Sequence, residues 1–164
     1  MGPSSFPPCC GEDARILILG TYPSPLSFES GFYYGHPRNR FWPLLAELLD
    51  EKIPATVEEK KALLLRNRIG LWDVLDNCDI EGAADASIRN PIYHDVSGLL
   101  AERDIRAVFF NGATAEKLFL KRKIELPVPS FRMPSTSPAN AAFSMERLAG
   151  QWQAILPWLD QGNE

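Results

Sequence analysis

Hydrophobic residues follow two patterns along the chain, and the first pattern predicts strands. Continuous apolar runs occupy 16–19 and 107–110, and a glycine closes each run, directly or one residue later. Such runs are typical of strands that are buried on both faces of a sheet. The less regular segment 69–74 and the segment 128–132, which Pro129 interrupts, predict two further short strands.

The second pattern repeats apolar residues at steps of three and four, and it predicts helices. Thr56 and Glu59 have the spacing of a capping box, so a helix is expected to begin directly after Thr56. Pro157 is expected to kink or end the last helix, because proline lacks the backbone N–H donor. Helices are thus predicted over 41–49, 57–66, 96–103, 115–119 and 145–155.

Strands that alternate with helices predict an α/β protein with a parallel sheet between two helical layers. We therefore expect a three-layer αβα fold with a short, mostly parallel central sheet. The first twelve residues are rich in proline, glycine and serine and lack apolar periodicity, so 1–12 is predicted to be a flexible tail. Residues 13–160 are predicted to form a single domain.

Polar loops follow three of the predicted strands, at 20–24, 111–112 and 133–140. Parallel α/β sheets bind their ligands beyond the carboxyl ends of the strands, so these loops are the expected place of a site. The segment 31–42 is the most unusual part of the chain, because it places three aromatic residues between two glycines and then a histidine, two arginines and an asparagine. Aromatic rings stack on nucleobases, and an asparagine amide both donates and accepts hydrogen bonds.

Within these segments, we expect functional roles for Tyr34 and Asn39 and a structural role for His36. Asn111 ends the second apolar run, where its amide either pairs with the edge of a base or caps the following helix. Both interpretations of Asn111 stay open at the level of sequence.

The chain has 164 residues and a formal net charge of −4, whereas proteins that coat DNA non-specifically are usually basic. Contact with nucleic acid therefore needs a local basic patch. Residues 31–42 carry two arginines and no acid, and 111–140 carries five bases against two acids. Within the second segment, Lys121–Lys123 either contact DNA or form a solvated helix face.

The three cysteines and two histidines do not have the spacing of a metal site. One adjacent pair and one isolated cysteine are typical of reduced thiols in a cytosolic protein. No apolar run is long enough to span a membrane, and the N-terminus lacks the features of a secretory signal. We therefore expect a cytoplasmic protein with no metal, no cofactor and no membrane partner.

Three segments together resemble the uracil-DNA glycosylase superfamily. They are Gly-Thr-Tyr-Pro-Ser at 20–24, Tyr-Tyr-Gly-His-Pro-Arg-Asn-Arg-Phe-Trp at 33–42 and Pro-Ser-Thr-Ser-Pro-Ala at 134–139. The string His-Pro-x-Asn-Arg-Phe-Trp is shared with the mismatch-specific uracil glycosylases. The last segment is most similar to the hypoxanthine-DNA (deoxyinosine) glycosylase family.

The resemblance implies a monomeric enzyme that flips a deaminated base out of DNA and binds it at the strand ends. It implies that Asn39 carries catalysis and that Tyr34 stacks on the flipped base. The implied base pocket consists of Gly20, Thr21, Tyr22, Tyr34 and Asn111. Contacts with DNA are implied for Ser24, Ser135, Thr136 and Ser137, and the basic segments predict further contacts by Arg38 and Arg132.

Tyr22 departs from the pattern of the uracil-cleaving relatives, which usually carry asparagine or aspartate there to activate water. A tyrosine is a poor base because its pKa is about 10, so hypoxanthine is the expected substrate rather than uracil. The two catalytic-loop segments at 20–24 and 133–139 contain no lysine that could form a Schiff base, so the enzyme should be monofunctional and leave an abasic site. A mismatch-specific uracil glycosylase and a non-catalytic DNA-binding relative remain as alternatives.

Overall fold

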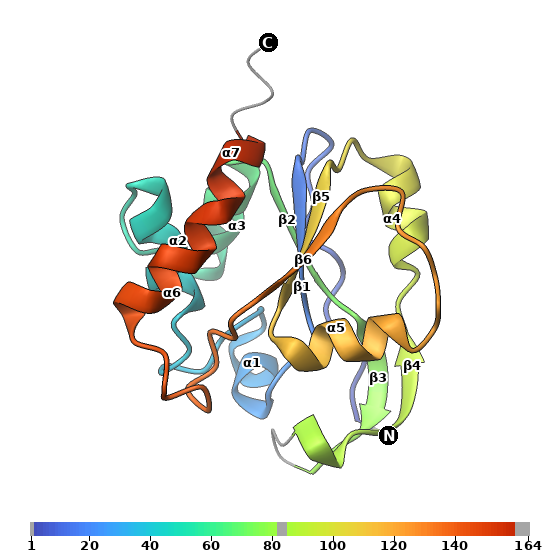
Figure 1. The fold of residues 1–164 in the computed structure, drawn as a ribbon. Coiled ribbons are helices and arrows are strands. Elements are labelled where there is room, and N and C mark those ends of the chain that lie inside the picture. The colour runs from blue at the N-terminus through green and yellow to red at the C-terminus, as the bar shows by residue number, and fades with distance from the viewer. Residues whose placement is uncertain (1, 82–84, 160–164) are drawn as a thin grey trace.

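The computed structural model describes residues 2–81 and 85–159 (Figure 1). Its larger sheet has four parallel strands in the order β2-β1-β5-β6. The predicted tail and the predicted domain each have one terminal residue, 1 and 160, outside the described residues. The four strands lie where the sequence predicts them, at β1 (Ile16–Gly20), β2 (Ile69–Asp73), β5 (Ala107–Asn111) and β6 (Ser130–Met133).

Burial explains why these strands differ in sequence. Every residue of β1, β2 and β5 is buried, since both faces of the sheet are covered. Strand β6 lies at an edge, and its first three residues are exposed. Pro129, directly before β6, is tolerated because an edge strand can spare one backbone donor.

Residues 2–12 pack along the outer edge of β2 and of the segment 75–79 that follows it. The backbone N–H groups of Ser5 and Cys9 donate to the carbonyls of Asp76 and Leu71 at 2.8 and 2.9 Å. The ring of Phe6 packs on the core, with its centroid 5.2 Å from that of Tyr33. This arrangement differs from the loose tail that composition predicts, because the segment pairs with an otherwise open strand edge.

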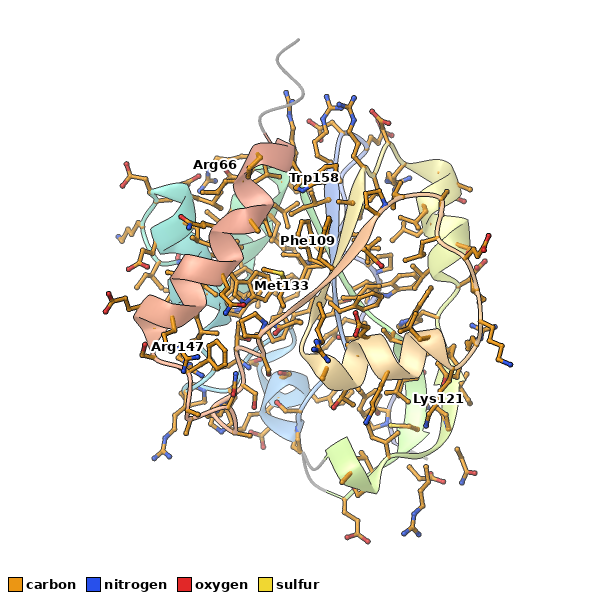
Figure 2. All side chains as sticks on the ribbon, viewed as in Figure 1. Arg66, Phe109, Lys121, Met133, Arg147 and Trp158 are labelled. Carbon is orange, nitrogen blue, oxygen red and sulfur yellow. The ribbon has the colours of Figure 1, made fainter. Side chains whose placement is uncertain are left out.

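Helices cover both faces of the sheet and complete three layers (Figure 1). On one face lie α2 (Phe41–Leu49), α3 (Val57–Arg66), α6 (Met145–Trp152) and α7 (Leu156–Leu159). On the other face lie α4 (Val96–Glu102) and α5 (Ala113–Leu120). The predicted three-layer αβα fold is therefore confirmed. Phe109 and Met133 mark its interior between the sheet and α6, where they are 1% and 6% exposed (Figure 2).

Local sequence explains where two of the helices begin and end. Helix α3 begins at the predicted capping box, in which Thr56 Oγ1 accepts from the Glu59 N–H at 3.1 Å and Glu59 Oε1 accepts from the Thr56 N–H at 3.2 Å. Helix α6 ends at Trp152, a 3-10 turn (Gln153–Ile155) follows, and Pro157 lies in the first turn of α7. The first turn of a helix does not need the N–H that proline lacks, so the α-helix ends before the proline rather than at it.

Three short elements were not predicted from the sequence. They are α1 (Pro25–Ser30) and the antiparallel strands β3 (Leu75–Asp79) and β4 (Arg89–Tyr93), with a 3-10 turn (Asp85–Ser87) between the two strands. Helix α1 begins at Ser24, whose side chain accepts from the Ser27 N–H at 3.2 Å. All three elements lie beyond the carboxyl ends of the parallel strands, at the lower end of the molecule in Figure 1.

Candidate active site

A cavity of about 310 Å³ lies at the carboxyl edge of the sheet. The ends of β1, β2 and β5, the segment 31–42 and the loop after β6 supply its lining. Its volume is at the lower end of the range of small-molecule sites. The cavity brings together Asn39 and all five predicted base-pocket residues, Gly20, Thr21, Tyr22, Tyr34 and Asn111.

A chain of hydrogen bonds joins three of the lining residues that are far apart in sequence. The Asn111 amide Nδ2 donates to Thr136 Oγ1 at 3.1 Å, and Thr136 Oγ1 donates to Asn39 Oδ1 at 2.8 Å. The backbone N–H of Thr136 donates to Asn111 Oδ1 at 3.1 Å, and that of Phe41 donates to Asn39 Oδ1 at 3.0 Å. Thr136 is fully buried in the middle of this chain, with 0% of its surface exposed.

The direction of this chain is fixed, because a backbone N–H can only donate. The side-chain oxygens of Asn39 and Asn111 are therefore acceptors. The Thr136 hydroxyl accepts from the Asn111 amide, so it must donate its own hydrogen bond to Asn39 Oδ1. The Asn39 oxygen then has both of its lone pairs in use. The Asn39 amide Nδ2 has no partner among the residues that the structure describes, so it remains a free donor at the cavity.

Arg40 and Trp152 hold the loop that carries Thr136. The Arg40 guanidinium donates to the carbonyls of Ser137 and Asn140 at 3.3 and 3.0 Å, and also to that of Phe143. The Trp152 indole N–H donates to the carbonyl of Pro134 at 2.9 Å. The adjacent residues Asn39 and Arg40 therefore both bond the segment before α2 to the loop after β6.

Tyr34 packs its ring on Phe41, with ring centroids 4.3 Å apart and an interplanar angle of 27°. Its backbone φ of 54° lies in the left-handed region, which is uncommon for a residue other than glycine. Its hydroxyl is buried without a hydrogen-bond partner in the described part of the chain. Burial raises the pKa of Tyr34, and the nearby Asp73 charge raises it further while the Asn111 side chain opposes the shift.

Asp73 is a lining residue that the sequence analysis did not select. The parallel register places it beside Gly20, and it is only 3% exposed. Burial raises the pKa of Asp73 to about 7, and a hydrogen bond from Ser5 Oγ to Oδ2, at 3.1 Å, opposes the shift. The available signal was an acidic residue at the end of an otherwise apolar run, where a parallel sheet presents its ligands.

Gly20 allows two polar groups to converge at this point. A Cβ atom at Gly20 would lie 2.6 Å from Asp73 Oδ1 and 2.8 Å from the Tyr34 hydroxyl oxygen. Both distances are shorter than real Cβ contacts, so a larger residue at position 20 would have to displace the carboxyl and the hydroxyl. The end of β1 is thus shaped by contacts that come from β2 and from the segment before α2.

Comparison with known proteins shows which family the chain belongs to. The sequence model of the uracil DNA glycosylase superfamily matches residues 7–159. The chain belongs to this superfamily. The match begins inside the predicted tail, in agreement with the packing of that segment on β2.

Relatives within the superfamily cover most of the chain. A hypoxanthine DNA glycosylase of Methanosarcina acetivorans is 38% identical over 155 residues, which are 92% of this chain and 95% of that protein. A second hypoxanthine DNA glycosylase, from Methanosarcina barkeri, is 37% identical over 114 residues, or 68% of this chain and 72% of that protein. The solution NMR structure of a uracil DNA glycosylase candidate from Methanosarcina acetivorans superimposes with a TM-score of 0.80 at 35% identity, covering 96% of this chain and 98% of the other.

Tyr22 occupies the glycosylase position where uracil-cleaving relatives were expected to carry a water-activating group. Its hydroxyl donates to the carbonyl of Pro3 in the N-terminal segment, and its ring packs at 5.5 Å from that of Phe28. Burial and the neighbouring negative charges raise the pKa of Tyr22 to about 12. The tyrosine therefore lines the glycosylase cavity as a neutral ring and cannot act as a base.

The residues predicted to contact DNA have different surroundings. Ser135 and Ser137 line the cavity and shape their own loop, since each hydroxyl accepts from a backbone N–H two residues on, at 3.1 Å. Ser24 caps α1 and also lines the cavity. Thr136 differs from the expectation, because its buried hydroxyl positions Asn39 instead of lying at the surface.

The predicted basic residues lie outside the cavity. Arg38 and Arg132 are exposed, and neither forms an ion pair with another described residue. Arg132 lines a second hollow together with the loop after β6. Lys121 lies at the outer end of α5, away from α1 (Figure 2). Because α5 has eight residues, that end lies about 12 Å along the helix from the strand end.

Two predictions about individual side chains can be compared with their contacts. Gly112 occupies the cap position of α5, so Asn111 does not cap this helix and instead pairs with Thr136. His36 Nδ1 accepts from the Arg38 N–H at 3.0 Å, in agreement with a structural role in its loop. Among residues 2–81 and 85–159, no three histidine, cysteine or acidic side chains form a group that could hold a metal ion, and no helix there could cross a membrane.

Proposed function

We propose that the protein is a monofunctional DNA glycosylase that removes hypoxanthine from deoxyinosine in DNA. Relatives at 38% and 37% identity carry the name hypoxanthine DNA glycosylase. The reaction hydrolyses the bond between C1′ of the deoxyribose and N9 of the base. It leaves an abasic site, which is the substrate of the next step of base-excision repair.

The orientation of the Asn39 amide is the observation that carries this proposal. Its oxygen is occupied by two hydrogen bonds, at 2.8 and 3.0 Å, and only the Nδ2 donor is available to a ligand. A departing purine gathers negative charge on its ring nitrogens and on O6 as the bond to the sugar breaks. A fixed donor at this position stabilises that charge, and such pre-oriented donors are among the strongest contributors to catalysis.

Asn39 and its neighbours explain why the site does not need a strong base. The sugar becomes oxocarbenium-like as the base departs, so a weakly activated water suffices as the nucleophile. The polar chain from Asn111 through Thr136 polarises the Asn39 amide and strengthens its donor. Tyr34 supplies a neutral ring beside the base, since its raised pKa keeps the hydroxyl protonated.

Substrate choice follows from the same lining residues. Uracil is a smaller base, and its removal by relatives was expected to use an asparagine or aspartate at position 22. Tyr22 fills that position with a hydroxyl that is committed to the carbonyl of Pro3 and whose pKa is about 12. Excision of hypoxanthine should therefore be faster than excision of uracil.

The proposal includes a DNA partner that contains a deaminated base. Arg38 and Arg132 are free to meet phosphates, and Ser24, Ser135 and Ser137 lie at the cavity toward which a flipped nucleotide would turn. The protein acts as a monomer in the cytoplasm, where its three cysteines, which are all free, stay reduced.

Single-turnover cleavage of defined oligonucleotides tests the proposed function. Duplexes with one deoxyinosine, deoxyuridine or deoxyxanthosine are incubated with excess protein, and abasic sites are then cleaved with alkali. We expect deoxyinosine to be processed much faster than deoxyuridine. A uracil rate equal to or above the hypoxanthine rate would favour the mismatch-specific uracil glycosylase, and binding without cleavage of any substrate would favour the non-catalytic relative.

A further inference from the structure

The buried carboxyl of Asp73 is the strongest feature of the cavity that the proposed function leaves unused. Asp73 ends β2 and lies beside Gly20 in the sheet register, so its carboxyl is at the strand ends where the base is expected to bind. Only 3% of the residue is exposed. A buried carboxyl normally has a partner for each oxygen, and among the described residues this one has a partner for one oxygen.

The two carboxyl oxygens have different surroundings. Oδ2 accepts from Ser5 Oγ at 3.1 Å. Oδ1 lies 2.6 Å from the position that a Cβ of Gly20 would occupy, and it has no hydrogen-bond partner in the described part of the chain. The N-terminal segment therefore holds one oxygen of Asp73 and leaves the other available to a ligand.

The groups around Asp73 favour a protonated carboxyl. The charged groups and tyrosines near it include Tyr22, Tyr33 and Tyr34, whose pKa values are raised by burial and by the Asp73 charge, so their hydroxyls stay neutral. His94 Nδ1 bonds the backbone carbonyl of Asp73 at 2.8 Å, while its Nε2 lies 3.4 Å from Asp76. Neither lysine nor arginine pairs with the carboxyl in the described ranges. Burial consequently raises the pKa of Asp73 to about 7, so both forms are present near neutral pH.

Excision of a purine creates a need that such a carboxyl can meet. The electron pair of the C1′–N9 bond moves into the purine ring as the bond breaks. A proton on N7 or N3 neutralises this charge and makes the base a better leaving group. The Asn39 donor stabilises the charge but keeps its hydrogen, so a separate acid has a distinct task.

We propose that Asp73 is a catalytic acid of this site, and that its protonated carboxyl gives a proton to a ring nitrogen of the departing hypoxanthine. This inference rests on the proposed glycosylase function. The C1′–N9 bond breaks, its electron pair stays with the base, and the base leaves in its neutral form. Water adds to C1′ and releases a proton, which returns the Asp73 carboxylate to its acid form directly or through solvent.

Replacement by asparagine isolates proton transfer from hydrogen bonding. Asp73→Asn keeps the size and a donor but has no proton to transfer. We expect the single-turnover rate on deoxyinosine DNA at pH 6 to fall by about 100-fold or more, as for the loss of a general acid. The wild-type rate should decline as pH rises above about 7, and the residual rate of the variant should be independent of pH over this range.

Two further variants assign the pH dependence to this carboxyl. Ser5→Ala removes the hydrogen bond that lowers the pKa of Asp73, so the decline should move to higher pH by roughly half a unit to one unit. Asp76→Asn makes the same chemical change three residues away at a half-exposed carboxyl that does not line the cavity. It should leave the rate and its pH dependence unchanged.

The outcomes separate this proposal from the proposed function. If wild-type protein does not cleave deoxyinosine DNA, the glycosylase assignment itself fails. If wild-type protein cleaves it and folded Asp73→Asn keeps both the rate and the pH profile, Asp73 is not an acid. A wild-type rate that increases with pH through 7 would make the ionised carboxylate the active form, and an unmoved decline in Ser5→Ala would assign the titration to another group. Either result would overturn the proposal.

Discussion

The two sides of the cavity differ in how completely their polar groups are hydrogen-bonded. On the side of the loop after β6, Asn39, Thr136 and Asn111 bond one another and the backbone, and the Asn39 Nδ2 group has no partner within residues 2–81 and 85–159. On the side of β2, Asp73 Oδ1 and the Tyr34 hydroxyl converge on Gly20 without hydrogen-bond partners among the described residues. One cavity thus joins a nearly complete polar network to an incomplete one.

This difference separates positioning from chemistry. A complete network fixes the direction of each member, and it makes the Asn39 amide a rigid donor. An incomplete network is costly to the fold, because burial penalises polar groups that lack partners. Such a cost is expected where a ligand supplies the missing partners. The polar groups on the β2 side should therefore lower the stability of the fold and serve the reaction, whereas those on the loop side should stabilise the fold.

The largest effect is expected at the Asn39 amide, on the side of the loop after β6. Asn39→Ser keeps an oxygen that can accept from the Phe41 N–H but removes the amide Nδ2. Loss of a pre-oriented donor should lower the single-turnover rate on deoxyinosine by about 100- to 1,000-fold. The variant should stay folded, because the Phe41 N–H keeps an acceptor, although the Thr136 hydroxyl loses its own at a cost of about 1–3 kcal/mol. A folded variant with a near-normal rate would reduce Asn39 to a structural acceptor at the start of α2.

The next effect concerns the stability cost of Asp73 as a function of pH. The folded-state pKa of about 7 exceeds the ordinary value of 3.8, so the folded protein binds more protons between these values and loses stability as pH rises through them. Asp73→Asn removes this cost and should stabilise the protein by a few kcal/mol more at pH 8 than at pH 5. Urea unfolding of wild type and Asp73→Asn at both pH values measures this difference.

A change of similar size but opposite sign is expected when the complete network is interrupted at its centre. Thr136→Val keeps the shape but leaves Asn39 Oδ1 and Asn111 Nδ2 each with one partner fewer. The free energy of unfolding should fall by about 1–3 kcal/mol, and the rate should fall as Asn39 loses its fixed direction. Thr136→Ser retains the hydroxyl and should recover most of the rate. Equal rates for Thr136→Val and Thr136→Ser would show that the Thr136 hydroxyl does not position Asn39.

Two adjacent tyrosines compare a buried hydroxyl on the β2 side with one that has hydrogen-bond partners. The Tyr33 hydroxyl donates to the carbonyls of Pro7 and Phe6 at 2.8 and 3.1 Å, whereas that of Tyr34 is buried without a partner among the described residues. Tyr33→Phe should cost about 1 kcal/mol of stability, a shift of a few degrees in melting temperature. Tyr34→Phe should cost nothing or be stabilising. A loss for Tyr34→Phe as large as that for Tyr33→Phe would show that the β2 side is not short of partners.

The smallest effect lies outside both sides, at the basic residues. Arg132→Ala should weaken DNA binding for all sequences and reduce the salt dependence by about one unit of log–log slope, as for the loss of one phosphate contact. Lys121→Ala removes the same charge at the outer end of α5 and should leave the slope unchanged (Figure 2). A matching decrease for Lys121→Ala would extend the DNA surface along that helix.

Local signals were sufficient for the parts of the fold that depend on local physics. The apolar runs identified β1 and β5, and the spacing of Thr56 and Glu59 identified the start of α3. The hairpin β3–β4 escaped prediction, because polar residues in its strands conceal the period of two. The packing of the N-terminal segment was not predicted, because a composition rich in proline and serine is typical of a flexible tail. In the fold, this segment pairs with the edge of a nearby strand.

The sequence by itself determined the layered fold, the strand ends that bear the site and the resemblance that singled out Asn39 and Tyr34. Only the tertiary structure decided what each polar group can do. Asn39, Thr136 and Asn111 are up to 97 residues apart, and their shared hydrogen bonds arise only when the loop after β6 is folded against the segment before α2. Asp73 gained its significance in the same way, because burial beside Gly20, not its identity, shifts its pKa to about 7.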